Sequence, residues 1–469
     1  MPVPRRALFL AIVAGFLAHV LVFNFVTDDA YISFRYAENL ARHGAQEFNL
    51  GERVEGFTNF LWTVTLGGLL SLGAPPEIAS RVLSALLGAA TLLLTLRLAR
   101  RSDPTSLQLV APALLAALPG FAAWSSGGLE TALFTALGLL GVALALRDRF
   151  AAAGVVLALA SMTRPEGALL FAAAATAELL YGRRPSFRFY AAFLVPFAAF
   201  YAWRFWYYGH PFPNTFYIKA AVGGTSLANG GRYLLGFARE NGLWLCAPLL
   251  ALYRARDRRL ALHSLVLLPL YTLYVASVGG DFMALHRFLV PMTPYLALIV
   301  HDTLRGRAWL RYAAPALIAL CAWNAARVDR GTLAFIGARD GIDSIGYLRK
   351  FADDRVIIGR WMRRNLPADT YVAVGGAGAL PYSSGLRALD SFGLSDAYIA
   401  HHVRPAGDRP GHQKVAPLHY LLERKPDLIC FPPLAALKER GYRSVCMKPP
   451  GLDAPYCCLQ RADRKLGPW

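Results

Sequence analysis

The chain has 469 residues, of which 55% are hydrophobic and 17% are charged, and its formal net charge is +19. A mean hydropathy of +0.37 is too high for an ordinary soluble protein of this length, so the composition indicates a polytopic membrane protein. The lysines and arginines form short clusters between apolar runs, as in cytoplasmic loops, and no nucleic-acid-binding motif accompanies them. We therefore expect no nucleic-acid partner.

Apolar runs in residues 1–326 predict about eleven membrane spans, since roughly 20 residues cross a bilayer as a helix. The first run, residues 8–26, follows two arginines as a signal peptide would, but no small-residue cleavage site precedes Asp28, so we expect an uncleaved span. Residues 150–162 are counted as a span although this run is shorter than that length. The other predicted spans are residues 78–99, 107–122, 129–146, 168–181, 189–206, 235–253, 260–278, 285–303 and 308–325.

Arginine clusters predict the orientation of these spans. With eleven spans, the clusters share one side, which the positive-inside rule makes cytoplasmic. They lie in residues 5–6, 97–101, 147–149, 183–188, 254–259 and 305–311. The apolar segment 60–72 would break this pattern as a span, so we predict a re-entrant or interfacial helix within a first external loop of residues 27–76. The N-terminus is then inside and the terminal region outside.

The terminal region, residues 327–469, is polar and is predicted to be an extracytoplasmic α/β domain. A helix is expected at residues 356–366, followed by strands at 370–375, 387–391 and 426–431. The glycine-rich GGAGAL after the first strand is short of a dinucleotide fingerprint and is more typical of a strand-to-helix turn. Four cysteines could form one or two disulfides in an oxidising compartment, with the pairing left open. They are Cys430, Cys446, Cys457 and Cys458.

Two adjacent carboxylates, Asp28 and Asp29, lie where the first span ends and a helix over residues 30–43 is expected to begin. A structural role is favoured by helix capping and by the helix dipole. A functional role is favoured by their depth, because a partly desolvated carboxylate at the edge of a membrane cavity can act as a general base. Successive helical residues point about 100° apart, so one aspartate can face a substrate while the other caps the helix. The sequence does not choose between them.

Several polar motifs fall on the same predicted external face and supply candidates for binding a phosphate group. Arg164, Lys219 and Arg287 are cations of the kind that hold phosphate oxygens, and His286 could donate a hydrogen bond to them. Each has a structural alternative. Arg164 could pair with Glu166, Lys219 could extend its ammonium group to the lipid headgroups, and His286 could be a buried structural histidine.

Glu55, Asn59, Asp281 and His412 are candidates for contacts with a sugar or with acceptor hydroxyls. Turn stabilisation is the alternative for the first two, and neutralisation of the arginine six residues later is the alternative for Asp281. His412 belongs to a polar stretch that could be a solvated loop. The adjacent histidines at 401 and 402 lack partners at metal-ligand spacing, so no metal site or cofactor is expected. A phosphate-bridged divalent cation would leave no such signature.

Read together, the motifs resemble a known family. Seven motifs occur in order over most of the chain, namely TDDAYISFRYAENLARHG, FNLGERVEGFTNFLW, RPEG, HPFPNTFYIKA, GGDFMALHRFLVP, LDSFGLSDAYIA and GHQK. They resemble the bacterial GT-C fold glycosyltransferases related to the mycobacterial terminal β-(1→2) arabinofuranosyltransferases. The resemblance implies a GT-C membrane domain and an inverting enzyme of the bacterial cytoplasmic membrane. Its donor would be a sugar, such as a pentofuranose, carried on polyprenyl phosphate. Its acceptor would be an envelope glycan or glycolipid. The acidic pair would be its catalytic centre.

The rival hypothesis is a transporter or flippase of a lipid-linked sugar. Such proteins place charged residues near the bilayer midplane and often contain inverted repeats. Here the polar motifs gather at one face, no internal repeat is apparent, and a large external domain follows. A membrane-anchored scaffold or sensor is a third reading, but it would not cluster charged groups in short loops. These features favour an enzyme embedded in the lipid bilayer.

Overall fold

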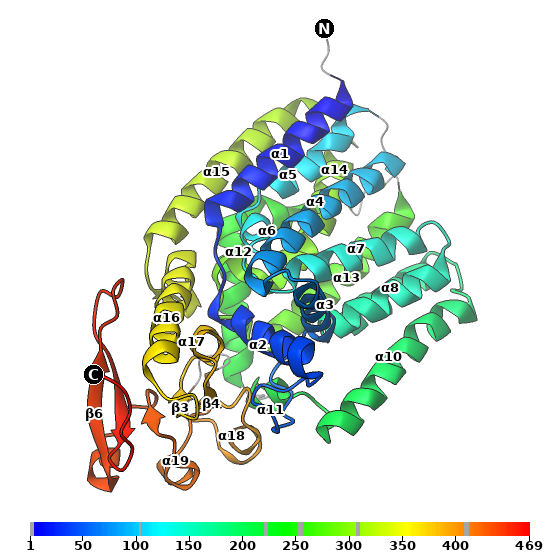
Figure 1. The fold of residues 1–469 in the computed structure, drawn as a ribbon. Coiled ribbons are helices and arrows are strands. Elements are labelled where there is room, and N and C mark those ends of the chain that lie inside the picture. Colours follow the sequence, from blue (N-terminus) through cyan, green and yellow to red (C-terminus); the bar gives the residue numbers. More distant parts are fainter. Residues whose placement is uncertain are drawn as a thin grey trace.

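The computed structural model describes residues 4–102, 105–219, 224–251, 255, 257–305, 310–407 and 412–469. Long helices form a bundle, and a smaller domain with a five-stranded sheet follows it (Figure 1). The helices of the first half are α1 (Arg5–Phe23), α2 (Asp28–His43), α3 (Phe60–Ser71), α4 (Pro76–Ser102), α5 (Val110–Ala116), α6 (Pro119–Ala123), α7 (Thr131–Ala145), α8 (Phe150–Thr163), α9 (Gly167–Leu180) and α10 (Phe187–Tyr208). Those that complete the bundle are α11 (Asn214–Lys219), α12 (Gly224–Ala251), α13 (Arg258–Ser277), α14 (Thr293–Arg305) and α15 (Ala314–Ala334).

Two predicted spans are broken, and in both cases the backbone explains why. The run at 107–122 forms a 3-10 turn followed by the short helices α5 and α6. Pro119 begins α6, and Leu118 before it is extended with ψ 119°, as proline requires of its predecessor. The run at 285–303 starts as the 3-10 helix η2 (Ala284–Met292), in which Leu285 and His286 have positive φ, and becomes α-helical only in α14.

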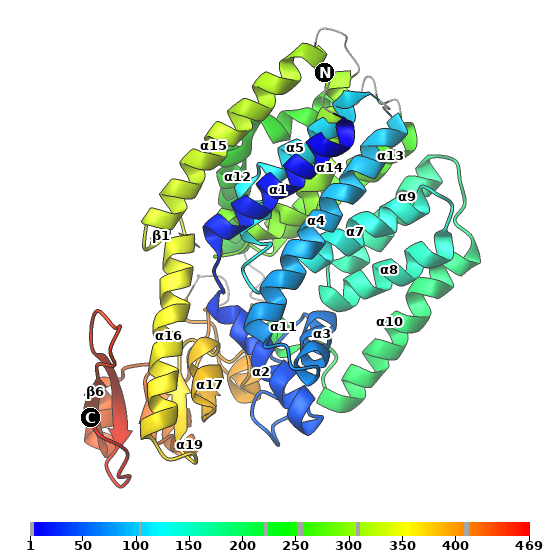
Figure 2. The ribbon, with the colours of Figure 1, turned by 45° about the horizontal axis from the view of Figure 1, so that its top comes forward.

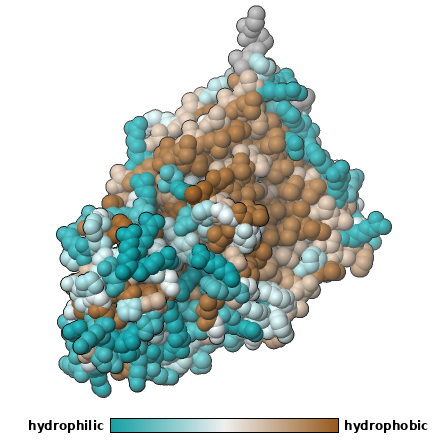
Figure 3. Space-filling model, in the orientation of Figure 1, coloured by the Kyte–Doolittle hydropathy of each residue, from teal (hydrophilic) through white to brown (hydrophobic). Residues whose placement is uncertain are grey.

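By length and composition, three of the described helices could each cross a membrane, namely α1, α4 and α13. Others are apolar but shorter, including α8 and α9. The count of eleven spans therefore stays a prediction. The surface agrees with a membrane setting, because hydrophobic residues cover the bundle between the polar terminal domain and a polar rim at the far end (Figure 3).

The segment predicted to be the first external loop contains the two helices that its sequence predicts. Helix α2 ends at Gly44, whose φ of 68° suits a glycine, and α3 follows as a separate short helix that packs on α2. Arg35 joins α2 to the terminal domain. Its buried guanidinium donates hydrogen bonds to the carbonyl oxygens of Phe48, Pro381 and Leu386. The loop is therefore enclosed between the bundle and the terminal domain.

The terminal domain begins after α15, which continues to Ala334 and so passes the boundary predicted at residue 326. Helix α16 (Ile345–Asn365) is almost twice as long as predicted and packs against α17 (Ala379–Ser384), as Figure 2 shows. The other helices of the domain are α18 (Ala397–His402) and α19 (Leu418–Arg424).

The sheet has the strand order β4-β3-β5-β7-β6. Its strands are β3 (Tyr371–Val374), β4 (Arg387–Asp390), β5 (Leu428–Ile429), β6 (Tyr442–Met447) and β7 (Tyr456–Arg461), and a separate short ladder joins β1 (Ala338–Arg339) to β2 (Ile342–Asp343). Strands β4, β3 and β5 are parallel, whereas β6 and β7 form an antiparallel hairpin that the sequence reasoning missed.

The four terminal cysteines form two disulfides. Cys446 and Cys457 face each other across the β6–β7 hairpin, and Cys430 after β5 is bonded to Cys458 on β7. The adjacent cysteines of β7 thus point to opposite sides of the strand, as the two-residue period of a strand requires. The sequence left this pairing open.

Candidate active site

Asp28 and Asp29 are the first two residues of α2, where negative charge is favoured by the helix dipole. Thr27 precedes them in an extended conformation, and its backbone N–H donates to the carbonyl oxygen of Gly127 at 3.2 Å, which ties the start of the helix to the bundle. Asp28 is buried and Asp29 is half-buried. Both carboxylates line the same cavity.

This cavity, of about 330 Å³, lies between α2 and the terminal domain. The terminal domain supplies most of its wall, from α16, from the turn after β3, and from the segments after β4 and β5. The carboxyl ends of parallel strands are where open α/β sheets bind their ligands, and this cavity has that location. Aromatic side chains suited to stacking on a sugar ring also line the cavity, one from a bundle loop and the others from the terminal domain. They are Phe282, Tyr347, Phe351, Phe392, Phe431 and Tyr456.

The glycine-rich turn between β3 and α17 holds Asp28. The carboxylate accepts the backbone N–H of Gly378 at 3.3 Å and that of Ala379 at 2.8 Å. A Cβ atom on Gly378 would come within 1.9 Å of the carbonyl oxygen of Asp28, so only glycine permits this approach. The sequence predicted a strand-to-helix turn here. The structure contains that turn and adds a contact with the acidic pair that local sequence could not reveal.

Burial raises the pKa of Asp28 from its usual 3.8 to about 6. The two backbone N–H groups and the positive charge of Arg355 oppose this rise, whereas the neighbouring carboxylate of Asp29 adds to it. A carboxylate with a pKa near 6 is mostly ionised at neutral pH yet is a stronger base than an ordinary aspartate. Asp28 therefore has the protonation behaviour that a general base needs.

Arg355 is the cation that the described part of the cavity wall presents beside the acidic pair. It follows Tyr347 and Phe351 at four-residue intervals along α16, so the three side chains share one face of the helix. The guanidinium carbon lies 4.5 Å from the ring centre of Phe351 and 4.7 Å from that of Tyr456. Sequence reasoning missed this residue, because one arginine in a helix with four others has no local signature.

His412 lines the cavity opposite α2. Its ring meets Phe282 edge-on, with ring centres 5.0 Å apart, and meets Phe392 edge-on at 4.7 Å. The imidazole is thus held between a bundle loop and the terminal domain. Of the ten site residues predicted from sequence, Asp28, Asp29 and His412 meet at this cavity.

Arg164 and Asn59 belong to a buried network behind the cavity. The Arg164 guanidinium contacts Glu166 at 2.6 Å and Glu130 at 3.2 Å. Asn59 donates to Glu130 at 2.9 Å and shares hydrogen bonds with Ser33 on α2. The pairing of Arg164 with Glu166 is the structural alternative that the sequence suggested. The network connects α2 to α7, α8 and α9.

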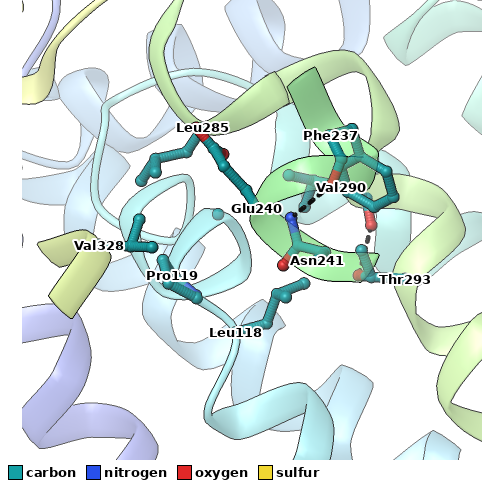
Figure 4. Close-up of a pocket in the computed structure, with 10 residues that line it drawn as sticks. Leu118, Pro119, Phe237, Glu240, Asn241, Leu285, Val290, Thr293 and Val328 are labelled. Atoms are coloured by element: carbon teal, nitrogen blue, oxygen red, sulfur yellow. Dashed lines mark hydrogen bonds between the residues drawn. The ribbon is translucent and has the colours of Figure 1, made fainter. Parts of the chain in front are cut away.

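Arg287 also has a carboxylate partner. It donates to Asp281 at 2.7 Å and lies over the ring of Trp124, so the neutralisation of Arg287 by Asp281 considered from sequence does occur. The preceding residue, His286, is directed into the bundle and lies 3.0 Å from Glu240. Glu240 lines a small cavity of about 10 Å³ beside the kink of α12 at Asn241 (Figure 4).

Glu55 and Lys219 complete the predicted residues. Glu55 is buried in a multiple ion pair with Arg204 of α10, with one pair of atoms 3.1 Å apart, and its backbone carbonyl accepts the N–H of Asn214. Lys219 is the last residue of α11, and its side chain lies outside the described part of the structure.

Within the described ranges, no group of three or more His, Cys, Asp or Glu side chains is placed to hold a metal ion. Two carboxylates and a phosphate could share a divalent ion without a third protein ligand. Metal independence accordingly stays a prediction, which a chelator tests.

The chain is similar in sequence and in fold to known proteins. A family model described as a domain of unknown function (DUF8728) matches residues 342–460. A terminal β-(1→2)-arabinofuranosyltransferase of Mycobacterium tuberculosis is 30% identical over 329 residues, which cover 58% of this chain and 52% of that protein. The chain thus spans about half the length of this curated relative. The resemblance inferred from the motifs is confirmed.

Solved structures show the fold. ArnT from Cupriavidus metallidurans, bound to undecaprenyl phosphate, superposes with a TM-score of 0.60 at 14% identity over 99% of each chain. An oligosaccharyltransferase of Archaeoglobus fulgidus gives a TM-score of 0.52 at 13% identity, covering 81% of this chain and 62% of that one. Both are GT-C proteins. The chain therefore has the GT-C fold of membrane glycosyltransferases.

Proposed function

We propose that this protein is an inverting membrane glycosyltransferase. It moves a sugar, with a pentofuranose such as arabinofuranose as the first candidate, from a polyprenyl-phosphate donor to a cell-envelope glycan or glycolipid. The arabinofuranosyltransferase relative supports the choice of sugar, and the undecaprenyl phosphate bound to ArnT supports the class of carrier.

The observation that carries the proposal is the position of the acidic pair. Asp28 and Asp29 begin a helix directly after α1 and face an aromatic-lined cavity that the terminal domain closes. A lipid-linked sugar presents its anomeric carbon at this level, with its prenyl tail in the bilayer. A buried carboxylate whose pKa is raised to about 6 supports a functional site here, because perturbed pKa values cluster at such sites.

We assign the role of general base to Asp28. It removes the proton from the acceptor hydroxyl while that oxygen attacks the anomeric carbon, and the bond from this carbon to the phosphate oxygen breaks with its electron pair staying on the phosphate. Two backbone N–H groups fix the orientation of its carboxylate. Asp29 keeps the pKa of Asp28 raised through its negative charge.

The remaining predicted residues enter as proposals of different kinds. His412 is placed to contact the acceptor or the sugar, because it lines the cavity. Glu55, Asn59 and Asp281 would reach a sugar only by exchanging the partners described above. The same holds for phosphate binding by Arg164, Arg287 and His286, since each has a carboxylate within 3.2 Å. Phosphate binding by Lys219 stays a prediction.

We place the active site on the extracytoplasmic face of the cytoplasmic membrane, with the N-terminus inside. Two disulfides in the terminal domain support this orientation, because disulfides persist in oxidising compartments. The arginine clusters between the apolar helices support it independently through the positive-inside rule.

The test is transfer from radiolabelled polyprenyl-phosphate arabinofuranose to a short arabinan by the purified full chain in lipid nanodiscs. The variants Asp28→Asn and Asp29→Asn are compared with the control Asp340→Asn. Asp340 is exposed, and its positive φ is a conformation that asparagine also adopts. Loss of transfer in Asp28→Asn, with Asp29→Asn still active and Asp340→Asn unaffected, supports the assignment. Full transfer by a folded Asp28→Asn variant would refute its role as base. Other donor sugars and a chelator are included in the same series.

A further inference from the structure

The sequence-based candidates for phosphate binding are already paired with carboxylates, as far as their side chains are described. Arg164 contacts two glutamates and Arg287 contacts Asp281, and all of these side chains are buried. A phosphate that bound there would have to displace a carboxylate from a desolvated ion pair, which is costly. None of these pairs lines the cavity that contains the acidic pair.

Arg355 differs from them in its environment. Its guanidinium lies over the rings of Phe351 and Tyr456, and no ion pair involving it occurs among the residues that the structure describes. A guanidinium oriented by ring stacking keeps its in-plane N–H groups available for two parallel hydrogen bonds, the geometry that phosphate oxygens accept. Aromatic contacts thus fix the direction of this cation without neutralising its charge.

The cation is also close to the reacting groups. Arg355 lines the cavity together with Asp28, and its charge acts on that carboxylate. The arginine alone lowers the pKa of Asp28 and so weakens the base, whereas a second anion in the cavity would offset this effect. The leaving group of the proposed reaction is such an anion.

We propose that Arg355 binds the phosphate of the lipid-linked donor and stabilises the negative charge that this group gains as it leaves. The inference rests on the proposed function and assigns its leaving-group site to the terminal domain. Arg355 takes up no proton: the acceptor proton goes to Asp28, and the bonding electron pair stays on the phosphate oxygen. Tyr456 and Phe351 are positioning residues, which hold the guanidinium in place.

The first experiment measures binding of undecaprenyl phosphate and of undecaprenol, its neutral alcohol, to the full chain in nanodiscs. Wild-type protein should prefer the phosphate, and Arg355→Gln should lose about 10- to 100-fold in phosphate affinity while binding the alcohol unchanged, as expected when a hydrogen-bonded charge contact is lost. Arg360→Gln, an exposed arginine on the same helix, is the matched control. An unchanged phosphate preference in Arg355→Gln would overturn the inference and leave the proposed function intact.

A second readout distinguishes phosphate binding from a purely structural role. Removing the positive charge should raise the pKa of Asp28, so the acidic limb of the pH profile of kcat/KM should move to higher pH in Arg355→Gln but not in Arg360→Gln. An unmoved limb contradicts the inference. Arg355→Lys should keep the limb near its wild-type position and recover part of the affinity.

A third measurement uses wild-type protein and does not depend on how well the variants fold. Phenylglyoxal modifies accessible arginines, and mass spectrometry should show that undecaprenyl phosphate protects Arg355 while undecaprenol does not. Equal modification with both lipids would overturn the inference. If wild-type protein shows this protection and yet transfers no sugar from any polyprenyl-phosphate donor, the proposed function fails and the phosphate site stands.

Discussion

The carboxylate of Asp28 accepts the backbone N–H of Ala379 at 2.8 Å, although 351 positions separate the two residues in the chain. One partner begins the first helix after α1, and the other begins a short helix of the terminal domain. This hydrogen bond makes the terminal domain part of the proposed catalytic centre. Changes on the terminal side should consequently affect the chemistry of the acidic pair.

Gly378→Ala should impair activity strongly. The new Cβ would come within 1.9 Å of the carbonyl oxygen of Asp28, so the turn and α2 must separate. Overpacking of this kind typically costs about 1–3 kcal/mol, and a shift of about 1 Å in a catalytic group can cost about 100-fold in rate. Measurement of kcat/KM and of the thermal midpoint of the purified protein tests this prediction.

Gly68→Ala is the matched control, because the Cβ of that helical residue on α3 would meet no atom within 4 Å. It should leave the rate unchanged and raise stability slightly, since alanine is the better helix former. Wild-type activity in Gly378→Ala would show that the turn does not hold the acidic pair in the working enzyme.

The pH dependence of transfer should reflect the pKa of Asp28. A base works ionised, so kcat/KM should rise as the pH increases through about 6 and level off above it. Asp29→Asn removes a neighbouring negative charge, which lowers the pKa of Asp28 and moves the acidic limb to lower pH.

A pH series with wild type and Asp29→Asn checks the sign of this shift. Asp28→Asn should lose about 100- to 10,000-fold in rate at every pH, the usual contribution of a general base. If Asp29→Asn instead abolishes transfer while Asp28→Asn retains the pH profile, the roles of the two aspartates are exchanged.

Much of the helical architecture could be predicted from apolar runs, because each such run must be buried in protein or lipid. Helix α2, its end at Gly44, and the separate α3 followed from local patterns as well. The missed strands β6 and β7 lack this kind of signal. Both are short and mix polar with apolar residues, and the buried residues of β7 are consecutive rather than alternating. Their pairing is reinforced by a disulfide whose connectivity no local pattern specifies.

The site could be predicted only where chemistry and local sequence coincide. The acidic pair stood out because adjacent carboxylates at the end of an apolar run need an explanation. Arg355 did not stand out, because its position depends on contacts between distant segments. Helix α16 packs against α17, and Tyr456 packs against the arginine at the cavity. Arg164 and Arg287 stood out and proved to have buried carboxylate partners, which only three-dimensional contacts reveal.

Arg164→Ala should destabilise the protein. The substitution leaves Glu130 and Glu166 buried without their cation, and breaking a buried ion pair in this way costs about 3–5 kcal/mol. Arg42→Ala removes an exposed pair with Glu38 and should cost under about 1 kcal/mol. Thermal unfolding in nanodiscs compares the two. A normal midpoint in Arg164→Ala together with a raised KM for the donor would instead favour direct phosphate binding by Arg164.

The two disulfides should contribute unequally to activity. Cys430 lines the cavity, whereas Cys446 and Cys457 bridge the hairpin at the far edge of the sheet. Each disulfide should contribute about 2–4 kcal/mol to stability. Only the double variant Cys430→Ser with Cys458→Ser should also reduce kcat/KM at temperatures below its unfolding transition. It loosens the segment after β5 that borders the acidic pair. Cys321→Ser, which changes a free thiol on α15, is the control. Equal losses of activity in both double variants would show that the hairpin acts on the site through overall stability alone.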